Sequence, residues 1–473
     1  MARVLMVSSE AAPFAKTGGL ADVVGALPSA LRSFGDEVAV IIPRYGSIDL
    51  KRMRRVYDDL PIYLGSTRYD TSIYQAPEEY PLYLLDCPLL FDRKGFYGDA
   101  GVDYPDNHIR FAVFSRGAIA AARVLFRTEI LHCHDWQSGP VAPYLRTLFS
   151  TDPTFMGVKT LFTIHNLGYQ GLFPPTVLPT VALDPDVFRP GGMEFFGKVS
   201  YIKGGIEFAD AINTVSPTYA REIQTPEYGF GLDGALRARA SVLTGILNGV
   251  DYREWNPETD QFLPAQYSAD DLSGKQICKQ QLLAEFGLNA DAIDRPLAGV
   301  VSRFTPQKGT ELIAEIAARL VAEDVYLVAL GSGDPALEET FRSLAAEFPG
   351  RIGVRVGFDN GLAHRIEAGA DMFLMPSRYE PCGLNQIYSL RYGTVPVVRA
   401  TGGLDDTIEE GTGFKFWGYS AESLFLAVRV AAQTFANPEP WQEMMRRGMR
   451  KDFSWRASAA AYSALYQQLL GRA

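Results

Sequence analysis

The sequence predicts an α/β protein made of two doubly wound domains in tandem. Short apolar runs alternate with helix-like patterns from one end of the chain to the other, which is typical of a parallel sheet with helices on both faces. The second half of the chain repeats this alternation. A length of 473 residues suits two large domains, or three of about 150 residues each.

Five apolar runs are the expected strands of the first half. The series begins with VLMVSS near the amino terminus and ends with DAINTVS. Two insertions, 57–107 and 169–197, are rich in Pro, Tyr and Asp and are expected to be long loops, which often carry function. The expected strands are 4–9, 38–43, 128–134, 159–165 and 210–216, and the expected helices are 20–33 and 138–149.

Five further runs are the expected strands of the second half, separated by helices such as 309–323. The segment ILNGVDYREWNPETD (246–260) is rich in turn-forming residues, so we expect a domain boundary at its start. The expected units are an N-terminal domain at 1–245, a C-terminal domain at 246–455, and a final helix at 456–473 that packs back on the N-terminal domain. The expected strands are 297–303, 325–331, 351–357, 371–377 and 394–400.

Composition excludes several classes of protein. Hydrophobic residues make up 47% of the chain and charged residues 21%, so it is neither disordered nor fibrous. The net charge of −10 disfavours a nucleic-acid partner, because an acidic surface repels phosphate. No apolar stretch is long enough to span a membrane. Four scattered cysteines without a CxxC pair fit a reducing compartment, so we expect a cytoplasmic protein.

A glycine motif occurs twice, as TGGLAD at 17–22 and as TGGLDD at 401–406. Each copy follows a strand-like run and precedes a helix. One interpretation is two turns that match by chance. The other is two related domains that each present a glycine loop to a shared cleft. In KTGGL, Gly18 and Gly19 would let a phosphate approach the helix N-terminus, and Lys16 would add a positive charge.

Two segments of the second half place polar residues after strands, where ligands of doubly wound sheets bind. SRFTPQKG carries Arg303 and Lys308, which are either a solvated loop pair or a clamp for a diphosphate. PSRYEPCGLNQ carries Glu380, which could accept sugar hydroxyls. The N–H groups that could face phosphate beside it belong to Gly383, Leu384 and Asn385.

Other motifs are weaker. LGSGDPALEE resembles a truncated dinucleotide fingerprint, and no P-loop is present. TIHNLGYQG and HCHDW place His165 and Asp135 at strand ends. His132 and His134 lack a third ligand at a helpful spacing, so we expect no metal site.

Together these motifs resemble one family, the bacterial glycogen synthases and plant starch synthases. The resemblance runs from about residue 2 to about residue 466 and includes KTGGLADV, HDWQ, TIHNLGYQG, LNGVDYREWNPETD, SRFTPQKG, EPCGLNQ and TGGLDDT. It implies the GT-B fold, in which two Rossmann-like domains face an interdomain cleft. It also implies transfer of glucose from ADP-glucose to the non-reducing end of an α-1,4-glucan, with retention at the anomeric carbon and without a metal or other cofactor.

The resemblance implies roles for individual residues. For the sugar-nucleotide donor it implies positively charged side chains at the diphosphate, backbone groups that contact the phosphates, and an aromatic side chain beside the adenine. These are Lys16, Arg303 and Lys308, then Gly18 and Gly19, and then Phe358. On the sugar side it implies that Glu380 holds glucose hydroxyls and that the His165 side chain binds the glucose while its carbonyl faces the anomeric carbon. Asn248 contacts the sugar, Asp22 lies near the reacting sugars, and Tyr97 and Asp135 are candidate contacts of the sugar or acceptor.

Four positions depart from the family pattern. Tyr388 holds the second position of the E-x7-E pattern of other retaining GT-B enzymes, as the glycogen-synthase branch implies. Phe358 replaces a frequent Tyr and keeps a stacking face without the hydroxyl. Gln137 stands where His is frequent, and Asn385 where Thr is frequent. These departures leave the fine donor and acceptor preferences open.

Three alternatives remain at this point. The chain could be a retaining GT-B transferase that uses UDP-glucose or another donor. It could be a sugar-nucleotide epimerase on the same fold, since a fold does not set a function. It could also be a silent glucan-binding protein, although the intact set of Lys16, His165, Arg303, Lys308 and Glu380 argues against this.

Overall fold

The structure, a computed structural model, describes residues 1–99 and 101–472. The chain forms two compact units. Unit 1 comprises Met1–Gly249 and Trp455–Ala473, and unit 2 comprises Val250–Ser454. The chain therefore passes between the units at Gly249 and at Ser454, close to the boundaries expected at residues 245 and 455.

Unit 1 is built on a nine-stranded sheet whose first seven strands in spatial order are parallel. All five strands expected in this half are present. The spatial order is β16 (Leu243–Gly245), β15 (Ala211–Thr214), β11 (Lys159–Ile164), β10 (Ile130–His134), β1 (Arg3–Val7), β2 (Glu37–Pro43), β7 (Leu82–Asp86), β6 (Ser72–Ala76) and β3 (Arg54–Tyr57).

The expectation of a long loop at 57–107 was wrong. LYLLD at β7 is apolar and mostly buried, and it pairs in parallel with β2; β6 and β3 then extend the sheet in antiparallel fashion. The other insertion, 169–197, contributes to a small three-stranded sheet. The additional strands are β4 (Ile62–Leu64), β5 (Thr67–Tyr69), β8 (Gly98–Asp99), β9 (Val102–Asp103), β12 (Leu172–Phe173), β13 (Glu194–Phe195) and β14 (Lys198–Ser200).

Helix α1 (Gly19–Arg32) shows why these segments are helical. Its buried residues Leu20, Val23, Val24, Leu27 and Leu31 recur on one face at the helical period. The helix expected at 138–149 is instead two short ones, interrupted by Gly139 and by Pro140, which has no N–H to donate. The other helices of this unit are α2 (Pro88–Phe91), α3 (Asn107–Val124), α4 (Asp135–Ser138), α5 (Val141–Arg146), α6 (Tyr201–Phe208), α7 (Pro217–Glu222), α8 (Asp233–Ala238) and α17 (Trp455–Leu469).

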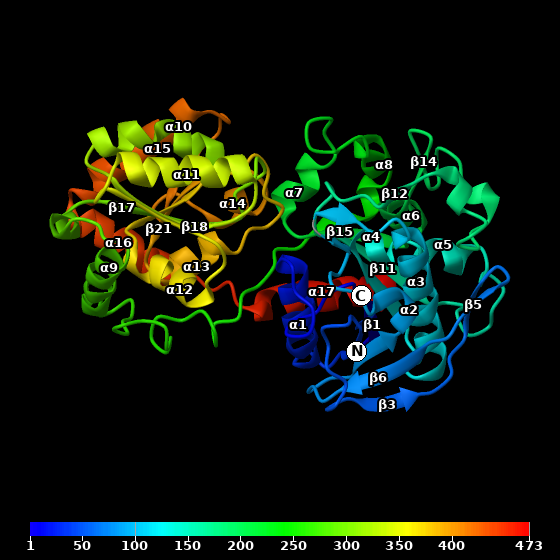
Figure 1. Ribbon diagram of the computed structural model, residues 1–473. Helices are drawn as coiled ribbons and strands as arrows, with labels where there is room; N and C mark the ends of the chain where they lie inside the picture. Colours follow the sequence, from blue (N-terminus) through cyan, green and yellow to red (C-terminus); the bar gives the residue numbers. More distant parts are fainter. Residues whose placement is uncertain (100, 473) are drawn as a thin grey trace. The chain divides into compact units, whose positions relative to one another are not determined.

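Unit 2 contains a six-stranded parallel sheet with a core on each face. Along β17 (Leu297–Val301) and β18 (Tyr326–Gly331), alternate residues enter opposite cores, which explains their nearly continuous apolar sequences. Helices α10, α11 and α15 cover one face, and α9, α12 and α13 cover the other (Figure 1). The spatial order is β19 (Ile352–Val356), β18 (Tyr326–Gly331), β17 (Leu297–Val301), β20 (Met372–Met375), β21 (Val395–Arg399) and β22 (Phe414–Phe416). The helices are α9 (Ser273–Glu285), α10 (Thr310–Ala322), α11 (Pro335–Glu347), α12 (Asn360–Gly369), α13 (Asn385–Arg391), α14 (Gly402–Thr407), α15 (Ala421–Phe435) and α16 (Pro438–Met449).

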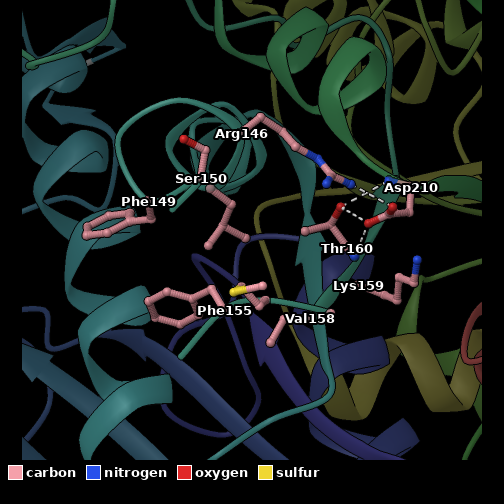
Figure 2. Close-up of a pocket in the computed structure, with 11 residues that line it drawn as sticks. Arg146, Phe149, Ser150, Phe155, Val158, Lys159, Thr160 and Asp210 are labelled. Atoms are coloured by element: carbon pink, nitrogen blue, oxygen red, sulfur yellow. Dashed lines mark hydrogen bonds and ion pairs between the residues drawn. The ribbon is translucent and has the colours of Figure 1, made fainter. Parts of the chain in front are cut away.

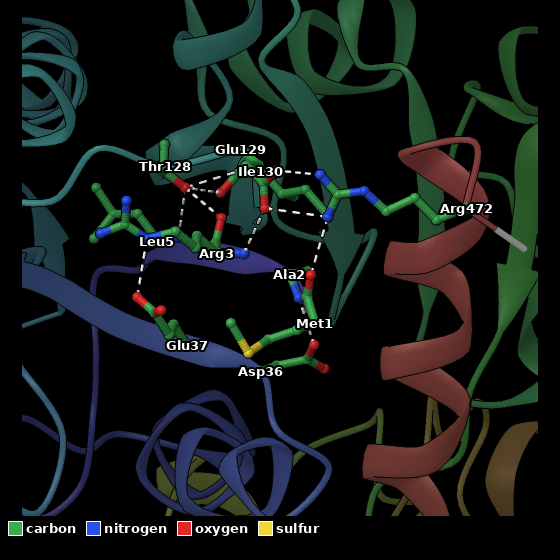
Figure 3. A network of polar contacts seen from close by, with 10 residues as sticks. All are labelled: Met1, Ala2, Arg3, Leu5, Asp36, Glu37, Thr128, Glu129, Ile130 and Arg472. Carbon is green, nitrogen blue, oxygen red and sulfur yellow. Dashed lines mark hydrogen bonds and ion pairs between the residues drawn. The ribbon is translucent and has the colours of Figure 1, made fainter.

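The last helix, α17, belongs to unit 1 and packs beside α1 (Figure 1). Its buried Tyr462 hydroxyl accepts from Asn213 Nδ2 at 2.9 Å, and its Tyr466 hydroxyl bonds to His132 Nδ1 at 2.8 Å. At the end of the chain, Arg472 donates to the Met1 carbonyl at 2.9 Å and pairs with Glu129 (Figure 3). The two ends of the chain are thereby joined in one unit. No helix among the described residues is long and apolar enough to cross a membrane.

The polar anchors of α17 lead to a stability prediction. Tyr462→Phe removes the acceptor of the buried Asn213 amide, so the free energy of unfolding should fall by about 1–3 kcal/mol. Urea unfolding followed by fluorescence measures this change. Tyr63→Phe is the matched control because Tyr63 is 47% exposed, and it should change stability by less than about 0.5 kcal/mol. Equal effects of the two substitutions would contradict the anchoring role.

Candidate functional site

In unit 1 the polar candidates follow the carboxyl ends of neighbouring parallel strands. Glu10 follows β1, Asp135 follows β10, His165 follows β11 and Asn248 follows β16. Parallel pairing brings these strand ends to one edge of the sheet. Residues far apart in sequence therefore gather along this edge.

The KTGGL loop lies at this edge, and Glu10 holds it. The buried Glu10 carboxylate accepts from the backbone N–H of Thr17 and from its hydroxyl. Gly18 and Gly19 begin α1, and a Cβ atom added to either would meet nothing within 4 Å. Packing within the described chain therefore does not require glycine at these two positions, whereas close approach by a ligand would.

Three more predicted residues lie around this loop. Lys16 Nζ donates to Asp22 Oδ1 at 2.6 Å, and burial raises the pKa of Asp22 although Lys16 opposes that rise. The Tyr97 hydroxyl donates to Glu10 and bonds to Ser9 Oγ at 2.8 Å. Sequence reasoning missed Glu10. The sequence does contain a signal for it, because the polar residues Ser8, Ser9 and Glu10 follow the first strand, β1, directly.

Asp135 positions the backbone of His165. Its Oδ1 accepts from the His165 N–H at 2.7 Å and from the Asn166 N–H at 3.4 Å. Burial raises the pKa of Asp135 to about 7, against the lowering effect of these two bonds. Asp135 also has a positive φ of 55°, a strained conformation for a non-glycine residue that is common at functional sites. Its observed role is therefore to hold the His165 loop.

Three histidines lie in a row beneath this edge. The His132 and His134 rings are 4.1 Å apart, and His134 Nδ1 lies 3.0 Å from His165 Nε2. Burial lowers the pKa of His132 and of His165 to about 3, and lowers that of His134 well below its usual value. Burial therefore favours the neutral form of all three rings near pH 7.

Asn248 is buried, and its Oδ1 atom has no hydrogen-bond partner within the described part of the chain. A buried oxygen without a partner is costly, so this atom is suited to accept from a ligand. The observation fits the sugar contact expected for Asn248.

In unit 2 the central feature is an ion pair. Lys308 Nζ donates to Glu380 Oε2 at 2.6 Å, and Ser377 Oγ donates to the same oxygen at 3.0 Å. Glu380 is 5% exposed, and the side-chain hydrogen bonds that its carboxylate accepts from the described residues go to Oε2. Arg303 is exposed and forms no ion pair with them. The predicted clamp residues therefore differ: Lys308 holds the carboxylate, whereas Arg303 extends into solvent.

Glycines explain how the loops of this site fit together. A Cβ on Gly309, which has a φ of +67°, would lie 2.0 Å from the Pro376 carbonyl oxygen. A Cβ on Gly402 or Gly403 would overlap the backbone of Glu380 or Cys382. The TGGLDD glycines thus let α14 pack directly against the Glu380 loop. The two glycine motifs consequently differ in role, since only the first is open.

The remaining donor-side candidates lie on neighbouring loops. Gly383 has a φ of +71° and precedes the short helix α13, which begins at Asn385. Asn385 Nδ2 donates to the Val301 carbonyl at 2.8 Å, so its side chain joins this loop to β17. Phe358 follows β19 and is 92% exposed, which leaves its ring open for stacking.

The truncated dinucleotide fingerprint at 330–339 has a structural role. Asp334 caps α11 by accepting from the backbone N–H of Ala336 at 2.8 Å, and Glu338 accepts from the N–H of Gly333. These carboxylates occupy the helix N-terminus that a phosphate would need. A Cβ on Gly331 would lie 2.0 Å from the Ser302 carbonyl oxygen.

Tyr388, at the second position of the E-x7-E pattern, stacks on Trp255 with ring centroids 3.9 Å apart. Trp255 also stacks on the buried His364, which bonds to Asp260 at 2.7 Å. Tyr388 therefore has a packing role in place of a carboxylate. No group of three or more His, Cys, Asp or Glu side chains among the described residues could hold a metal ion.

Unit 1 also has a pocket whose lining contains none of these residues (Figure 2). It includes Lys159 and Thr160 at the start of β11, whereas His165 follows the end of that strand. Three of its polar side chains are paired with one another: Arg146 donates to Asp210 Oδ1 at 2.6 Å, and Thr160 donates to Asp210 Oδ2 at 2.9 Å. The pocket is therefore distinct from the candidate site.

The raised pKa of Asp135 predicts a pH effect. Because about 7 is above the unfolded value of 3.8, the native state binds the proton more tightly. Asp135 thus contributes stability below about pH 4 that is lost as the pH rises through about 7. Asp135→Asn keeps an oxygen for the His165 N–H but does not titrate. Its stability relative to wild type should therefore rise over this range in chemical denaturation, whereas the exposed Asp70→Asn control should show no such trend.

An Asp135→Asn difference that stays constant from about pH 4 to about pH 8 would contradict this burial effect.

Comparison with known proteins identifies the family of the chain. Residues 3–238 match the family described as the starch synthase catalytic domain, and residues 289–434 match glycosyl transferases group 1. The chain is 50% identical to a glycogen synthase of Koribacter versatilis, over 98% of each chain. It is 51% identical to glycogen synthases of Anaeromyxobacter dehalogenans and Myxococcus xanthus, over 99% of each chain.

Two solved structures match the whole chain. The catalytic domain of starch synthase IV from Arabidopsis thaliana, bound to ADP and acarbose, is 34% identical, with a TM-score of 0.91 and complete coverage of both chains. Sucrose-phosphate synthase from Thermosynechococcus elongatus has a TM-score of 0.61 over 99% of both chains at 20% identity, which bears on the fold alone. The GT-B fold class is confirmed. With about half of its residues identical to theirs from end to end, the chain belongs to the glycogen synthase and starch synthase family.

Proposed function

We propose that this protein transfers glucose from ADP-glucose to the non-reducing end of an α-1,4-glucan, with retention of the anomeric configuration. The relatives that match its full length are named glycogen synthases, and the starch synthase IV structure holds ADP and acarbose. The four cysteines are buried and are not joined in disulfides, which fits a cytoplasmic enzyme.

The arrangement around Glu380 is the observation that carries the proposal. One carboxylate oxygen is held by Lys308 and Ser377, which leaves the other to accept hydrogen bonds. A fixed acceptor of this kind suits the hydroxyl groups of a glucose ring. Because the Lys308 ammonium has three donor hydrogens, it can hold Glu380 and still donate to a phosphate oxygen.

Departure of ADP breaks the bond from the anomeric carbon to the diphosphate and leaves negative charge on the diphosphate. Arg303 and Lys308 of unit 2 are the cations that stabilise that charge in our proposal. Gly18 and Gly19 leave room for phosphate at the start of α1, where the helix dipole adds to the effect. The exposed Phe358 ring stacks on the adenine.

The sugar itself is held from unit 1 in this proposal. His165 is neutral and therefore acts as a hydrogen-bonding group rather than as an acid or base. Asn248 supplies its buried Oδ1, and Asp135 holds the loop that carries His165. Fixed contacts of this kind place donor and acceptor in register, which lowers the entropy cost of the reaction.

Label transfer tests the proposal directly. The protein is incubated with glycogen and radiolabelled ADP-glucose or UDP-glucose, in excess EDTA because the proposed site relies on side-chain cations. We expect label in the polymer, with a higher kcat/KM for ADP-glucose. A preference for UDP-glucose would reject the donor assignment, and conversion of the donor without glycogen would indicate an epimerase.

Arg303 and Lys308 should act mainly on the transition state. A fixed donor to a developing oxyanion is worth on the order of 3 kcal/mol, so Arg303→Ala and Lys308→Ala should each lower kcat by about a hundredfold or more. The donor KM should change less, and the double variant should lose less than the product of the two effects. Steady-state kinetics at saturating glycogen measures both constants.

The two variants should differ in stability. Lys308→Ala leaves the buried Glu380 carboxylate without its cation, whereas Arg303 has no such partner among the described residues. Only Lys308→Ala should therefore lower the unfolding midpoint. Arg342→Ala, on the exposed face of α11, is a matched control for loss of an arginine. Loss of donor affinity with an unchanged kcat would show that these cations do not act on the chemical step.

Glu380 should position glucose without forming a covalent bond to it. Glu380→Gln keeps the size of the side chain and one acceptor oxygen, so we expect it to retain measurable glucosyl transfer. Mass spectrometry of a digest prepared during turnover checks the alternative. A glucosyl adduct on Glu380 would overturn the positioning role.

A further inference from the structure

His134 contacts His165 through its ring and has no role of its own in the proposed mechanism. It ends β10, is fully buried, and its Nδ1 lies 3.0 Å from Nε2 of His165. Its other nitrogen, Nε2, is buried and has no hydrogen-bond partner in the part of the chain that the structure describes. His165, in contrast, is 8% exposed, and its Nδ1 bonds to no atom of these residues.

The bond between the two rings can carry its hydrogen in two ways. If His165 Nε2–H donates, then the neutral His134 must carry its own hydrogen on Nε2, where a buried N–H would remain without an acceptor. If His134 Nδ1–H donates, then only a lone pair stays unsatisfied at Nε2. In proteins, buried N–H groups that lack an acceptor are rarer than buried acceptors that lack a donor. The second arrangement is therefore favoured.

This arrangement determines which hydrogen-bonding group His165 presents at Nδ1, the ring nitrogen that does not face His134. A neutral imidazole that accepts at Nε2 must carry its hydrogen on Nδ1. That nitrogen is the one without a partner among the described residues. His165 then presents an N–H donor to the sugar, and the sugar hydroxyl that accepts it can still donate elsewhere.

We propose that His134 is a positioning residue that fixes the Nδ1–H tautomer of His165 and thereby makes it an obligatory hydrogen-bond donor to the transferred sugar. The assignment of the sugar as ligand rests on the proposed function. The tautomer itself does not, because it follows from contacts within unit 1.

The surroundings of His134 keep its ring in place. Its carbonyl accepts from Ser138 Oγ at 2.8 Å, and its ring packs against that of His132. His132 is in turn bonded to Tyr466 of α17 and to Thr163 of β11, at 2.8 and 2.6 Å. Two titratable groups contact the pair directly: Asp135 accepts from the His165 N–H, and the His132 ring packs against that of His134. Because burial strongly disfavours a charge on any of these rings, the tautomer should not change near neutral pH.

Nitrogen NMR of the full chain tests the tautomer without any substrate. The protein has 5 histidines, so ¹⁵N-histidine labelling gives a spectrum that single substitutions can assign. Two-bond ¹H–¹⁵N correlations separate protonated from unprotonated ring nitrogens. We expect His165 to show a protonated Nδ1 and an unprotonated Nε2 from about pH 6 to about pH 8. A protonated Nε2, or an imidazolium, would overturn the proposal.

A matched pair of variants tests the effect on catalysis. Asn and Leu have similar size, and the Asn amide places a donor near the position of His134 Nδ1. We expect His134→Leu to mix the His165 tautomers and to lower kcat by about tenfold, as for the loss of one hydrogen bond. His134→Asn should keep the tautomer and most of kcat.

Tyr466→Phe is the control for a merely structural effect. It removes a hydrogen bond from the same buried cluster, to His132, without touching His134 or His165. It should lower stability and leave both kcat and the His165 spectrum unchanged. Equal loss of activity in His134→Leu, His134→Asn and Tyr466→Phe would overturn the positioning role. If glucosyl transfer fails in wild type while the tautomer is as expected, then the proposed function fails and the tautomer assignment stands.

Discussion

Parallel pairing of the strands determines where the candidate site residues lie in both units. Because neighbouring strands run in the same direction, all of their carboxyl ends lie along one edge of each sheet. Glu10, Asp135, His165 and Asn248 gather at that edge in unit 1, although they come from distant parts of the sequence. In unit 2 the same rule places the loops after β17 and β20 side by side, where Lys308 meets Glu380.

Burial of polar groups determines the geometry and the charge of the side chains at these two sheet edges. A buried carboxylate or imidazole needs a partner, and here each partner fixes a geometry: Glu10 holds the glycine loop, Asp135 holds the His165 backbone, and Lys308 with Ser377 holds Glu380. The same burial keeps the histidines neutral. The groups left without a full set of partners, such as Asn248 Oδ1, are the ones suited to meet a substrate.

Much of this could be predicted from the sequence, because strand–helix alternation and glycine loops are local signals. The sequence could not show contacts between distant segments. Glu10 has no motif of its own, and its partners Thr17 and Tyr97 become evident only when the sheet is formed. The strands within 57–107 were missed because Tyr, Pro and Asp mask a buried run such as β7. The two TGGL motifs look alike in sequence, yet only Gly402 and Gly403 have backbone atoms where a Cβ would lie.

A brief pulse of labelled ADP-glucose onto glycogen shows where the glucose is added and how it is linked. The isolated polymer is then treated with an exo-acting hydrolase that releases maltose from α-1,4-linked non-reducing ends. If the glucose is added to non-reducing ends through α-1,4 linkages, the label leaves as maltose at the very start of digestion, well before most of the polymer is degraded. Label that resists this enzyme, or that emerges in proportion to the total glucose released, would contradict transfer to the non-reducing end with retention.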